Sequence, residues 1–305
     1  MATLREIKRR IRGVKNIAQV TRALEAVSAS RVRKAQAQVI ATRPYAEQAW
    51  EILTSLTLQA GAGPSLHPLL ATRPVKAIGL IVISGDRGLA GPYNVNIVRL
   101  ALEFVRDRRA PIQLVTLGRK GTELLVRAGQ RIVAEFGNLS AAPTALEVSP
   151  IGRIVVDDFL KGQIDEVHIA YTDFINTLQQ KATLKRLLPL QVEDEARRRA
   201  EHTAGAQAGR LTRREYLYEP SREGLLDTLI PRFIQLQVYQ AVLESLASEH
   251  SARMVAMRNA TDSARDLVSQ LTLTYNKARQ QSITSELLDI AGGAEALKQV
   301  LARAD

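Results

Sequence analysis

The chain has 305 residues, of which 46% are hydrophobic and 4% aromatic, with no cysteine and a formal net charge of +11. Without cysteine, disulfides, thiolate metal sites and thiol-based redox control are excluded. No apolar run approaches the roughly 20 residues of a membrane span, and the first residues lack the apolar segment of a secretion signal. We therefore expect a helix-rich protein that is cytosolic or peripheral to a membrane.

Positive charge is concentrated at one end of the chain. Residues 1–43 contain eleven Lys and Arg against only Glu6 and Glu25, whereas residues 221–305 carry nine basic and ten acidic side chains. A basic helix is a solvated face, a nucleic-acid footprint or a surface that meets an acidic partner. Charge alone leaves these interpretations open.

The first predicted element is a helix without proline over residues 3–39, where Thr3 and Glu6 fit a capping box at the start. Proline is expected to interrupt it at Arg43-Pro44-Tyr45, after which the helix resumes. We assign residues 1–60 to this N-terminal shaft segment. Its narrow apolar stripe recurs at steps of three and four and consists of Leu4, Ile7, Ile11, Val14, Ile17, Val20, Leu24 and Val27.

Residues 75–192 are predicted to form a central α/β domain. Short apolar, β-branched runs alternate there with helical stretches, a pattern typical of a parallel sheet with right-handed crossovers. Residues 193–215 are charged and rich in small side chains, which predicts a polar surface loop. The predicted strands cover residues 77–83, 112–117, 131–136 and 166–174, with an edge strand at 183–192, and the predicted helices cover 94–108, a stretch from 119, and 151–160.

A glycine-rich turn at residues 84–91 follows the first predicted strand, at the place where a nucleotide-binding loop would lie. Its glycines are spaced G-x-x-G-x-x-G instead of G-x-G-x-x-G, and the lysine of a P-loop is missing. We therefore interpret it as a structural turn. The four histidines are isolated from one another and from carboxylate pairs, so no metal, cofactor or catalytic residue is predicted.

A second, longer helix is predicted from residue 223 to about residue 290, within a C-terminal shaft segment at 221–303. A helix of about 70 residues would extend roughly 100 Å, and its apolar stripe needs a cover. The N-terminal helix is the available partner, and a folded domain between the two makes them antiparallel. The predicted heptad seam comprises Leu236, Tyr239, Leu243, Leu246, His250, Arg253, Met257, Ala260, Ala264, Leu267, Leu271, Thr274 and Ala278.

Five stretches of sequence resemble the gamma-subunit family of the F-type ATP synthases, the central rotor shaft. They are ITSELLD (283–289) with GAEA (293–296), SEHSARMVAM (248–257), YNKARQ (275–280), RALEAV (22–27) with RVRK (31–34), and SGDRGLAG (84–91). In the last of these, Gly85 and Ala90 stand where many relatives have Ser and Cys. The resemblance covers almost the whole chain. It implies an α/β fold with a long antiparallel coiled coil of N- and C-terminal helices and a central Rossmann-like parallel-sheet domain.

The resemblance implies a non-catalytic rotor subunit that couples ion flow through the membrane sector to ATP synthesis or hydrolysis. The implied partners are the ring of catalytic and non-catalytic nucleotide-binding subunits (alpha and beta), the epsilon subunit and the membrane c-ring. One copy per complex is expected, at the cytoplasmic face of the bacterial plasma membrane, without cofactor or nucleic acid. The residues implied in contacts with the nucleotide-binding subunits or at the seam are Leu24, Arg253, Met257, Arg279, Gln280, Thr284, Glu286, Leu287 and Leu288. Those implied at the foot, near the c-ring, are Arg43, Tyr45, Tyr216 and Glu219.

Two alternatives come from other classes of protein. A basic coiled coil that binds RNA or DNA would show salt-dependent binding of nucleic acid. An α/β enzyme with helical arms would bind ATP or a dinucleotide, which calorimetry would detect.

Overall fold

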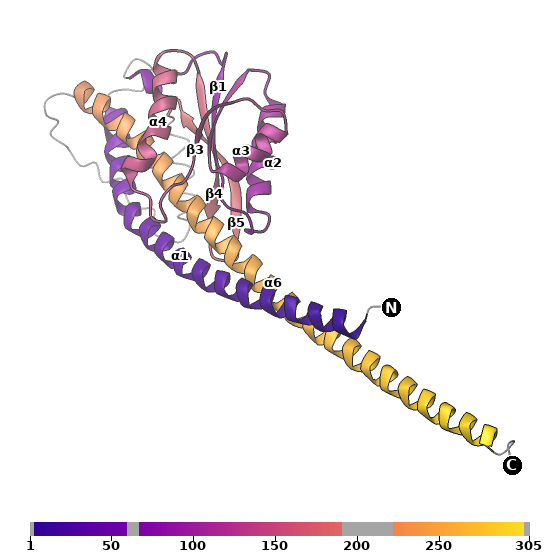
Figure 1. Ribbon diagram of the computed structural model, residues 1–305. Coiled ribbons are helices and arrows are strands. Elements are labelled where there is room, and N and C mark those ends of the chain that lie inside the picture. The colour runs from indigo at the N-terminus through magenta and orange to yellow at the C-terminus, as the bar shows by residue number, and fades with distance from the viewer. Residues whose placement is uncertain (1–2, 60–66, 191–221, 302–305) are drawn as a thin grey trace. The chain divides into compact units, whose positions relative to one another are not determined.

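The computed structural model describes residues 3–59, 67–190 and 222–301 (Figure 1). The chain divides into two compact units, unit 1 (residues 1–27 and 254–305) and unit 2 (residues 28–253). Two long helices, α1 (Leu4–Gln59) and α6 (Arg222–Leu301), each contribute to both units. Unit 2 also holds a 3-10 turn (Pro68–Leu70), β1 (Ile78–Ile83), α2 (Tyr93–Asp107), β2 (Ile112–Leu117), α3 (Arg119–Arg127), β3 (Ile132–Phe136), α4 (Ala145–Leu160), β4 (Glu166–Phe174) and β5 (Gln180–Leu188).

The strands of unit 2 form one five-stranded sheet in the order β3-β2-β1-β4-β5. β1 pairs in parallel with β2 and β4, β2 pairs in parallel with β3, and β5 is an antiparallel edge strand. β2 and β4 have the predicted bounds, and β5 starts and ends earlier than predicted. The expected fold class, an α/β fold with long terminal helices and a mostly parallel sheet, is confirmed. The predicted loop at 193–215 lies outside the described residues.

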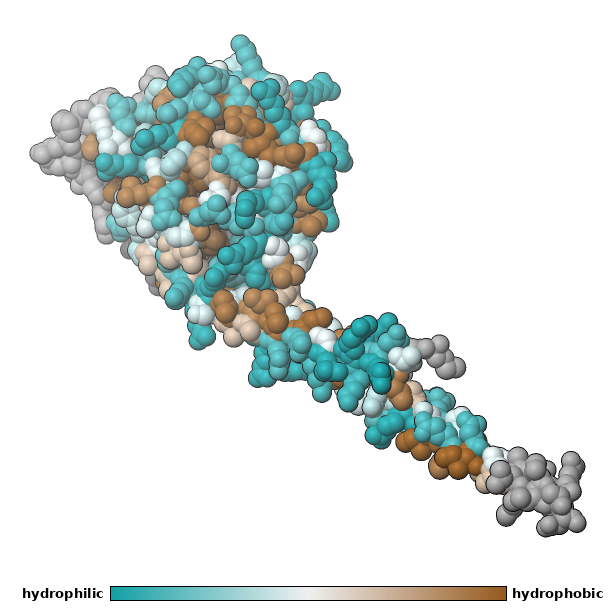
Figure 2. Space-filling view, in the orientation of Figure 1, coloured by the Kyte–Doolittle hydropathy of each residue, from teal (hydrophilic) through white to brown (hydrophobic). Residues whose placement is uncertain are grey.

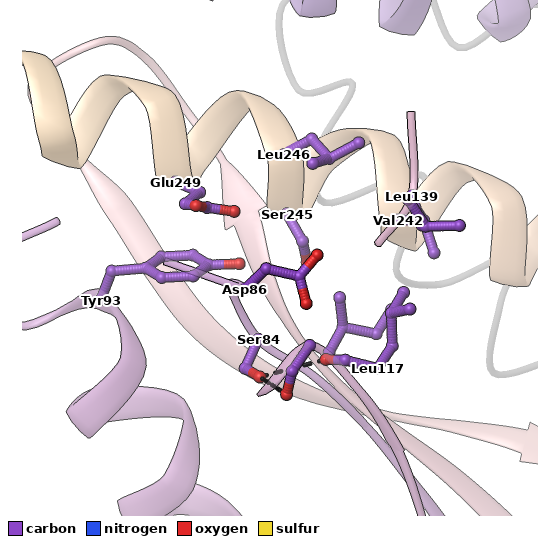
Figure 3. A pocket seen from close by; sticks show the side chains of 11 residues that line it. Ser84, Asp86, Tyr93, Leu117, Leu139, Val242, Ser245, Leu246 and Glu249 are labelled. Carbon is purple, nitrogen blue, oxygen red and sulfur yellow. Dashed lines mark hydrogen bonds between the residues drawn. The ribbon is translucent and has the colours of Figure 1, made fainter. Parts of the chain in front are cut away.

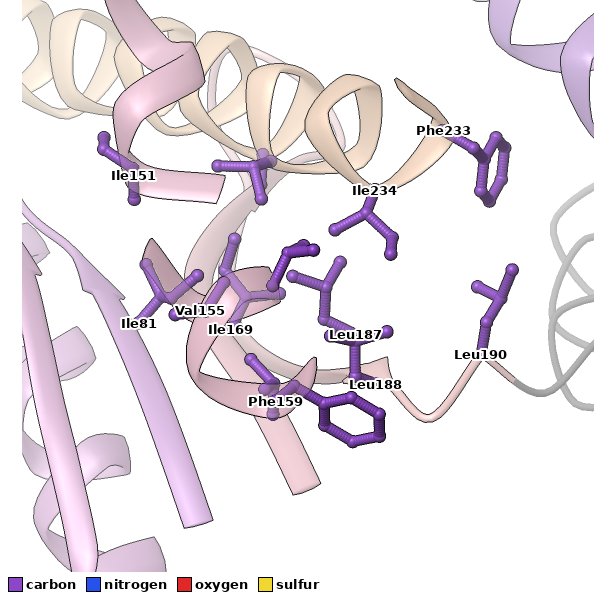
Figure 4. Packing of buried hydrophobic residues seen from close by; sticks show 14 of the residues in the cluster. Ile81, Ile151, Val155, Phe159, Ile169, Leu187, Leu188, Leu190, Phe233 and Ile234 are labelled. Atoms are coloured by element: carbon purple, nitrogen blue, oxygen red, sulfur yellow. The ribbon is translucent and has the colours of Figure 1, made fainter. Parts of the chain in front are cut away.

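Alternate residues of β1 enter two different cores, as the two-residue period of a strand requires. Ile81 packs with side chains from α4, β4 and α6 in the larger core (Figure 4). Leu80 packs with Ile97 of α2 and Leu125 of α3 in the smaller core. Every residue of β1 is buried, which is why its sequence is a continuous apolar run.

Within unit 2, α1 and α6 run antiparallel. Trp50 stacks at a tilt on Phe233 with ring centroids 5.4 Å apart, while Arg31, earlier in α1, acts electrostatically on Glu249, later in α6. An early residue of α1 thus lies near a late residue of α6, and a late residue of α1 lies near an early residue of α6, which is the pattern of antiparallel packing. The expected arrangement of the two terminal helices is therefore present in this unit.

Pro44 does not interrupt α1, contrary to the prediction. Val39, Trp50 and Leu53 are buried on either side of it and share one helical face. Proline inside a helix costs about 3 kcal/mol, whereas burying each such large side chain contributes roughly 1.5–3 kcal/mol. Packing of the common face therefore outweighs the lost backbone hydrogen bond.

A second boundary was misplaced, because α4 starts at Ala145 and not at residue 151. Thr144 and Glu147 form a capping box, and Pro150 is accommodated inside the helix. The capping box predicted for α1 is present: the backbone N–H of Thr3 donates to Glu6 Oε2 over 3.0 Å, and the backbone N–H of Glu6 donates to Thr3 Oγ1 over 3.4 Å.

The buried seam of α1 keeps a strict heptad, and the predicted apolar stripe leaves it after Val14. Two consecutive steps of three, to Ile17 and then Val20, rotate the stripe away from the packed face, and both side chains are exposed, as is Val27. Thr21 takes the seam position and is buried. The seam of α1 comprises Ile7, Ile11, Val14, Ala18, Thr21, Glu25, Ser28, Val32, Ala35 and Val39, all buried or half-buried.

In unit 1 the two helices pack through small and polar side chains. Thr21 Oγ1 and Thr261 Oγ1 are 2.7 Å apart and share a buried hydrogen bond. On α6 the alternate seam positions are Thr261, Val268 and Tyr275, each buried or half-buried. The predicted seam residues Leu267 and Thr274 are exposed, and the residues that follow them, Val268 and Tyr275, face the seam in their place. Among the helices described here, none is long and apolar enough to cross a membrane.

Candidate functional site

The C-terminal part of α6 carries the exposed residues that the resemblance assigns to partner contacts. All six are exposed: Arg279, Gln280, Thr284, Glu286, Leu287 and Leu288. Large apolar side chains are at least half exposed in the same stretch, namely Ile283 (50%), Leu287 (61%), Leu288 (66%) and Ile290 (70%). Brown surface is visible there in Figure 2, next to the grey residues. An exposed apolar patch of this kind marks an interaction surface.

The other predicted site residues are in different environments. Met257 is buried and Leu24 half-buried in unit 1, while Arg253 is buried in unit 2. Of the predicted foot residues, Tyr45 is 66% exposed on α1. The side chain of Arg43 and the residues Tyr216 and Glu219 lie outside the described part of the chain. Their roles stay predictions.

The glycine-rich turn at residues 84–91 is fastened to β2 and α3 by Ser84 (Figure 3). Its Oγ donates toward the carbonyl oxygens of Leu117 and Gly118 and accepts from the N–H of Gly121, over 2.9 to 3.1 Å. A Cβ at Gly121 would lie 2.3 Å from that Oγ, and Gly118 has a φ of +99°. Only glycine lets the three segments approach this closely.

Asp86 occupies the N-terminus of α3, where a nucleotide-binding fold would hold a phosphate. Its Oδ1 accepts from the N–H of Arg119 (3.1 Å) and its Oδ2 from the N–H of Asn138 (2.9 Å). The N–H of Lys120 donates to the carbonyl oxygen of Gly85 over 3.0 Å. The chain itself therefore satisfies the donors that a phosphate would need, which supports the structural interpretation of the turn.

A small cavity lies between the turn and α6 and is lined by Ser84, Asp86, Tyr93, Ser245 and Glu249, among others (Figure 3). Its volume of about 40 Å³ admits water but falls far below the roughly 300–1,000 Å³ of ligand pockets. Burial, and then the charge of Glu249, raises the pKa of Tyr93, so its phenol stays protonated. The cavity has the size of a hydration site.

Three polar residues of α6 meet beside this cavity. Arg253 Nη2 lies 2.5 Å from Glu249 Oε1, and Arg253 Nη1 lies 3.3 Å from His250 Nδ1. Because a guanidinium only donates, His250 accepts at Nδ1 and is neutral with its proton on Nε2. Burial, followed by the charges of Arg253 and Arg31, lowers the pKa of His250 to about 4. Burial raises the pKa of Glu249, and Arg253 acts against that shift.

The sequence did not reveal the contact between this helical group and the turn. Both stretches belong to the resemblance, as residues 248–257 and 84–91. Glu249, Asp86 and Asn94 nevertheless carry no signal as single residues, because their partners are distant in sequence. Gly85 is the local feature that points to a close neighbour. A Cβ at this position would lie 2.8 Å from Glu249 Cδ.

Unit 1 has a separate polar groove of about 390 Å³ between its two helices. Arg22 and Glu25 line it from α1, and Arg258, Asp262 and Arg265 line it from α6. Asp262 and Arg265 already form an ion pair at 3.3 Å. The groove therefore has mixed charge and little apolar surface.

Comparisons with known proteins agree over nearly the whole chain. A family model described as ATP synthase matches residues 3–297. A protein named ATP synthase gamma chain from Dehalococcoides mccartyi (strain CBDB1) is 48% identical over 297 residues, 97% of this chain and 100% of that protein. The chain belongs to the ATP synthase gamma-chain family. The gamma chain of Herpetosiphon aurantiacus is 45% identical over 308 residues, 98% of this chain and 100% of that protein.

The fold is also found in a solved rotary assembly. A chain of the Euglena gracilis mitochondrial ATP synthase, from a structure of OSCP, F1 and c-ring, matches with a TM-score of 0.63 at 20% identity and covers 96% of this chain and 94% of that one. The predicted function is confirmed by the family: this is a non-catalytic central-stalk rotor subunit of a membrane-associated ATP synthase. The nucleic-acid alternative receives no support from these matches.

Proposed function

We propose that the exposed stretch of α6 from Arg279 to Ile290 is the surface that this gamma-family chain turns against the nucleotide-binding subunits. The observation that carries the proposal is the outward orientation of its apolar side chains, with Leu287 and Leu288 more than 60% exposed on a regular helix. Apolar contacts are non-directional, so a surface of this kind can slide past successive partners without breaking strong bonds at each step. Rotation then presents a different side of α6 to each catalytic subunit and biases its conformation.

The exposed basic residues at the start of α1 suggest that this part of the chain faces acidic segments in the proposed complex. The first turns of α1 display exposed Arg5, Lys8, Arg9, Arg10, Arg12 and Lys15. Clustered exposed cations attract acidic segments over about 10 Å at 0.1 M salt and less far as salt rises. We infer that acidic loops of the surrounding subunits face this part of α1, and that salt weakens the association.

We further propose the remaining partners from the family. The foot of the chain would dock on the epsilon subunit and the membrane c-ring, with Tyr45 as its described exposed candidate. One copy per complex and a position at the cytoplasmic face of the bacterial plasma membrane complete the proposal. The bacterial origin of the relatives supports the proposed location. The presence of a chain of similar fold in an assembly of F1 and c-ring supports the proposed partners.

The rotor surface can be tested with bulky substitutions at Gln280 and Thr284, both exposed on α6. We expect a Gln280→Trp/Thr284→Trp variant to co-purify with the catalytic subunits, yet to pump fewer ions per ATP hydrolysed, because indole rings obstruct the moving contact. The measurement is the ratio of ATP-driven proton pumping to ATP hydrolysis in membrane vesicles.

The matched control is Leu146→Trp, which adds an indole at the 84% exposed Leu146 of α4 and is expected to leave the ratio unchanged. If the double variant assembles and couples like the parent, the assignment of this surface is wrong. Failure of the parent chain to enter the complex at all would refute the proposed partners as a whole.

A further inference from the structure

One arginine of α6 reaches across to the glycine-rich turn. Arg253 is the last residue of unit 2 on this helix. Its Nε donates to the carbonyl oxygen of Gly88, and its Nη2 donates to the carbonyl oxygens of Arg87 and Gly88, all over 3.3 Å. A single planar guanidinium thus holds two consecutive carbonyls of the turn.

The same guanidinium is fixed on its own helix. Glu249, one turn earlier, accepts from Nη2 over 2.5 Å, and His250 accepts from Nη1 over 3.3 Å. The Arg253 side chain is only 11% exposed. Charge-assisted bonds are roughly twice as strong as neutral ones, and a fork of donors adds a fixed direction. Helix and turn are therefore joined through a rigid, nearly dry contact.

The turn is in its own right a rigid extension of the sheet. Its Gly85 N–H donates to Asn94 Oδ1 over 2.9 Å, and Asn94 Nδ2 donates to the carbonyl oxygen of Arg87 over 3.4 Å. Asp86 and Ser84 bind it to the neighbouring strands and to α3, as described above. A force applied to the Arg87 and Gly88 carbonyls is consequently passed to β1 and α2 without slack in the loop.

The remaining contacts between α6 and the sheet are mostly apolar, for example through Val242 and Ile234, and two neutral hydrogen bonds join Ser245 and Ser248 to the backbone of Thr172 in β4 over 3.2 and 3.1 Å. Apolar packing resists the rolling of a helix about its long axis only weakly, because dispersion and hydrophobic contacts have no preferred direction. The two neutral bonds share one residue of the sheet, and neutral bonds are roughly half as strong as charge-assisted ones. We propose that Arg253 is a positioning residue, a clamp that fixes the rotational setting of α6 on the sheet so that torque passes through the bond between Arg253 and the turn. The proposal rests on the rotor surface proposed above and assigns one joint within the same subunit.

Angular fluctuation of the rotor measures the clamp directly. The chain has no cysteine, so Arg109→Cys, at an exposed position of unit 2, gives it a unique attachment point for a bead in the assembled complex with its nucleotide-binding ring immobilised. We expect Arg253→Gln to increase the variance of the bead angle during a pause by about two-fold or more, and Arg253→Lys to give a smaller increase because lysine has one donor atom in place of a fork.

Leu125→Ala is the control for a merely structural effect. Leu125 is fully buried in the smaller core, so its truncation destabilises unit 2 without touching the clamp, and the variance should stay at the parental value. Equal variance in the parent and Arg253→Gln would overturn the proposal, and so would equal broadening by Leu125→Ala. Where Arg253→Gln does not assemble, Arg253→Lys decides by the same criterion. An absence of rotation in the parent refutes the rotor function itself, which is a distinct outcome.

Discussion

Protonation of His250 should make the folded chain sensitive to acid, and the magnitude follows from its surroundings. The ring is buried, accepts a bond from Arg253 at Nδ1 and faces the charge of Arg31, so its pKa falls from 6.5 to about 4 on folding. The unfolded chain therefore binds this proton first. The stabilisation is complete above about pH 6.5 and is lost as the pH falls toward 4. From the two pKa values, the loss between pH 7 and pH 4.5 is about 2 kcal/mol.

The assay is urea unfolding of the full chain at several pH values, followed by fluorescence of the only tryptophan, Trp50, which is buried in the same unit as His250. His250→Asn is the test variant, because an amide oxygen can accept from Arg253 and does not titrate. Asparagine has a constant cost in the helix, which cancels when only the pH dependence is compared. Glu249, whose raised pKa works in the opposite direction, is present in both proteins and cancels in the same way.

We expect the wild-type chain to lose about 2 kcal/mol more than His250→Asn between pH 7 and pH 4.5. Parallel loss in the two proteins would refute the argument, because it would mean that His250 binds its proton equally well in the folded and unfolded states.

Two further predictions concern packing. Thr261→Val removes the buried hydrogen bond to Thr21 and should lower the unfolding free energy by about 1 kcal/mol. The double variant with Thr21→Val should lose less than the sum of the two single changes. Urea titrations followed by circular dichroism measure both losses. Gly121→Ala brings a Cβ to 2.3 Å from Ser84 Oγ and should lower the unfolding free energy by at least about 2 kcal/mol. Gly13→Ala, in open space on α1, should raise it by up to about 1 kcal/mol. Thermal unfolding measures both changes, and the reverse order would contradict the close approach at Ser84.

The strands were the part of the fold most easily predicted. β2 and β4 have the predicted bounds, and β1 starts one residue later than predicted, because a strand buried along its whole length is a continuous apolar run in the sequence. The start of α4 was missed, because the capping box at Thr144 and Glu147 begins the helix six residues before the predicted residue 151. Pro150 lies in the second turn and removes a backbone hydrogen bond there, but Val148, Ile151 and Val155 are buried on either side of it and hold the helix in place.

The seam between the long helices was harder to predict than their existence. A pattern of apolar residues favours Ile17 and Val20, yet packing selects Thr21, whose hydroxyl is satisfied by Thr261 and by the carbonyl oxygen of Ile17. A small polar residue costs little in a seam when its hydrogen bonds are made inside it. Sequence periodicity counts apolar side chains and cannot register a bond between residues far apart in the chain.

The two proposed functions of α6 require opposite interactions, and its residues are distributed accordingly. A joint that transmits torque has to keep one geometry, which calls for directional bonds shielded from water, such as those of Arg253 to Glu249 and Gly88. A surface that meets several partners in turn has to release each of them, which calls for weak, non-directional contacts such as exposed Leu287 and Leu288 can make. A helix that was polar at its tip and apolar at its joint would hold its partners too strongly and roll on its own sheet, so the order of these residues along α6 is itself an argument for rotation.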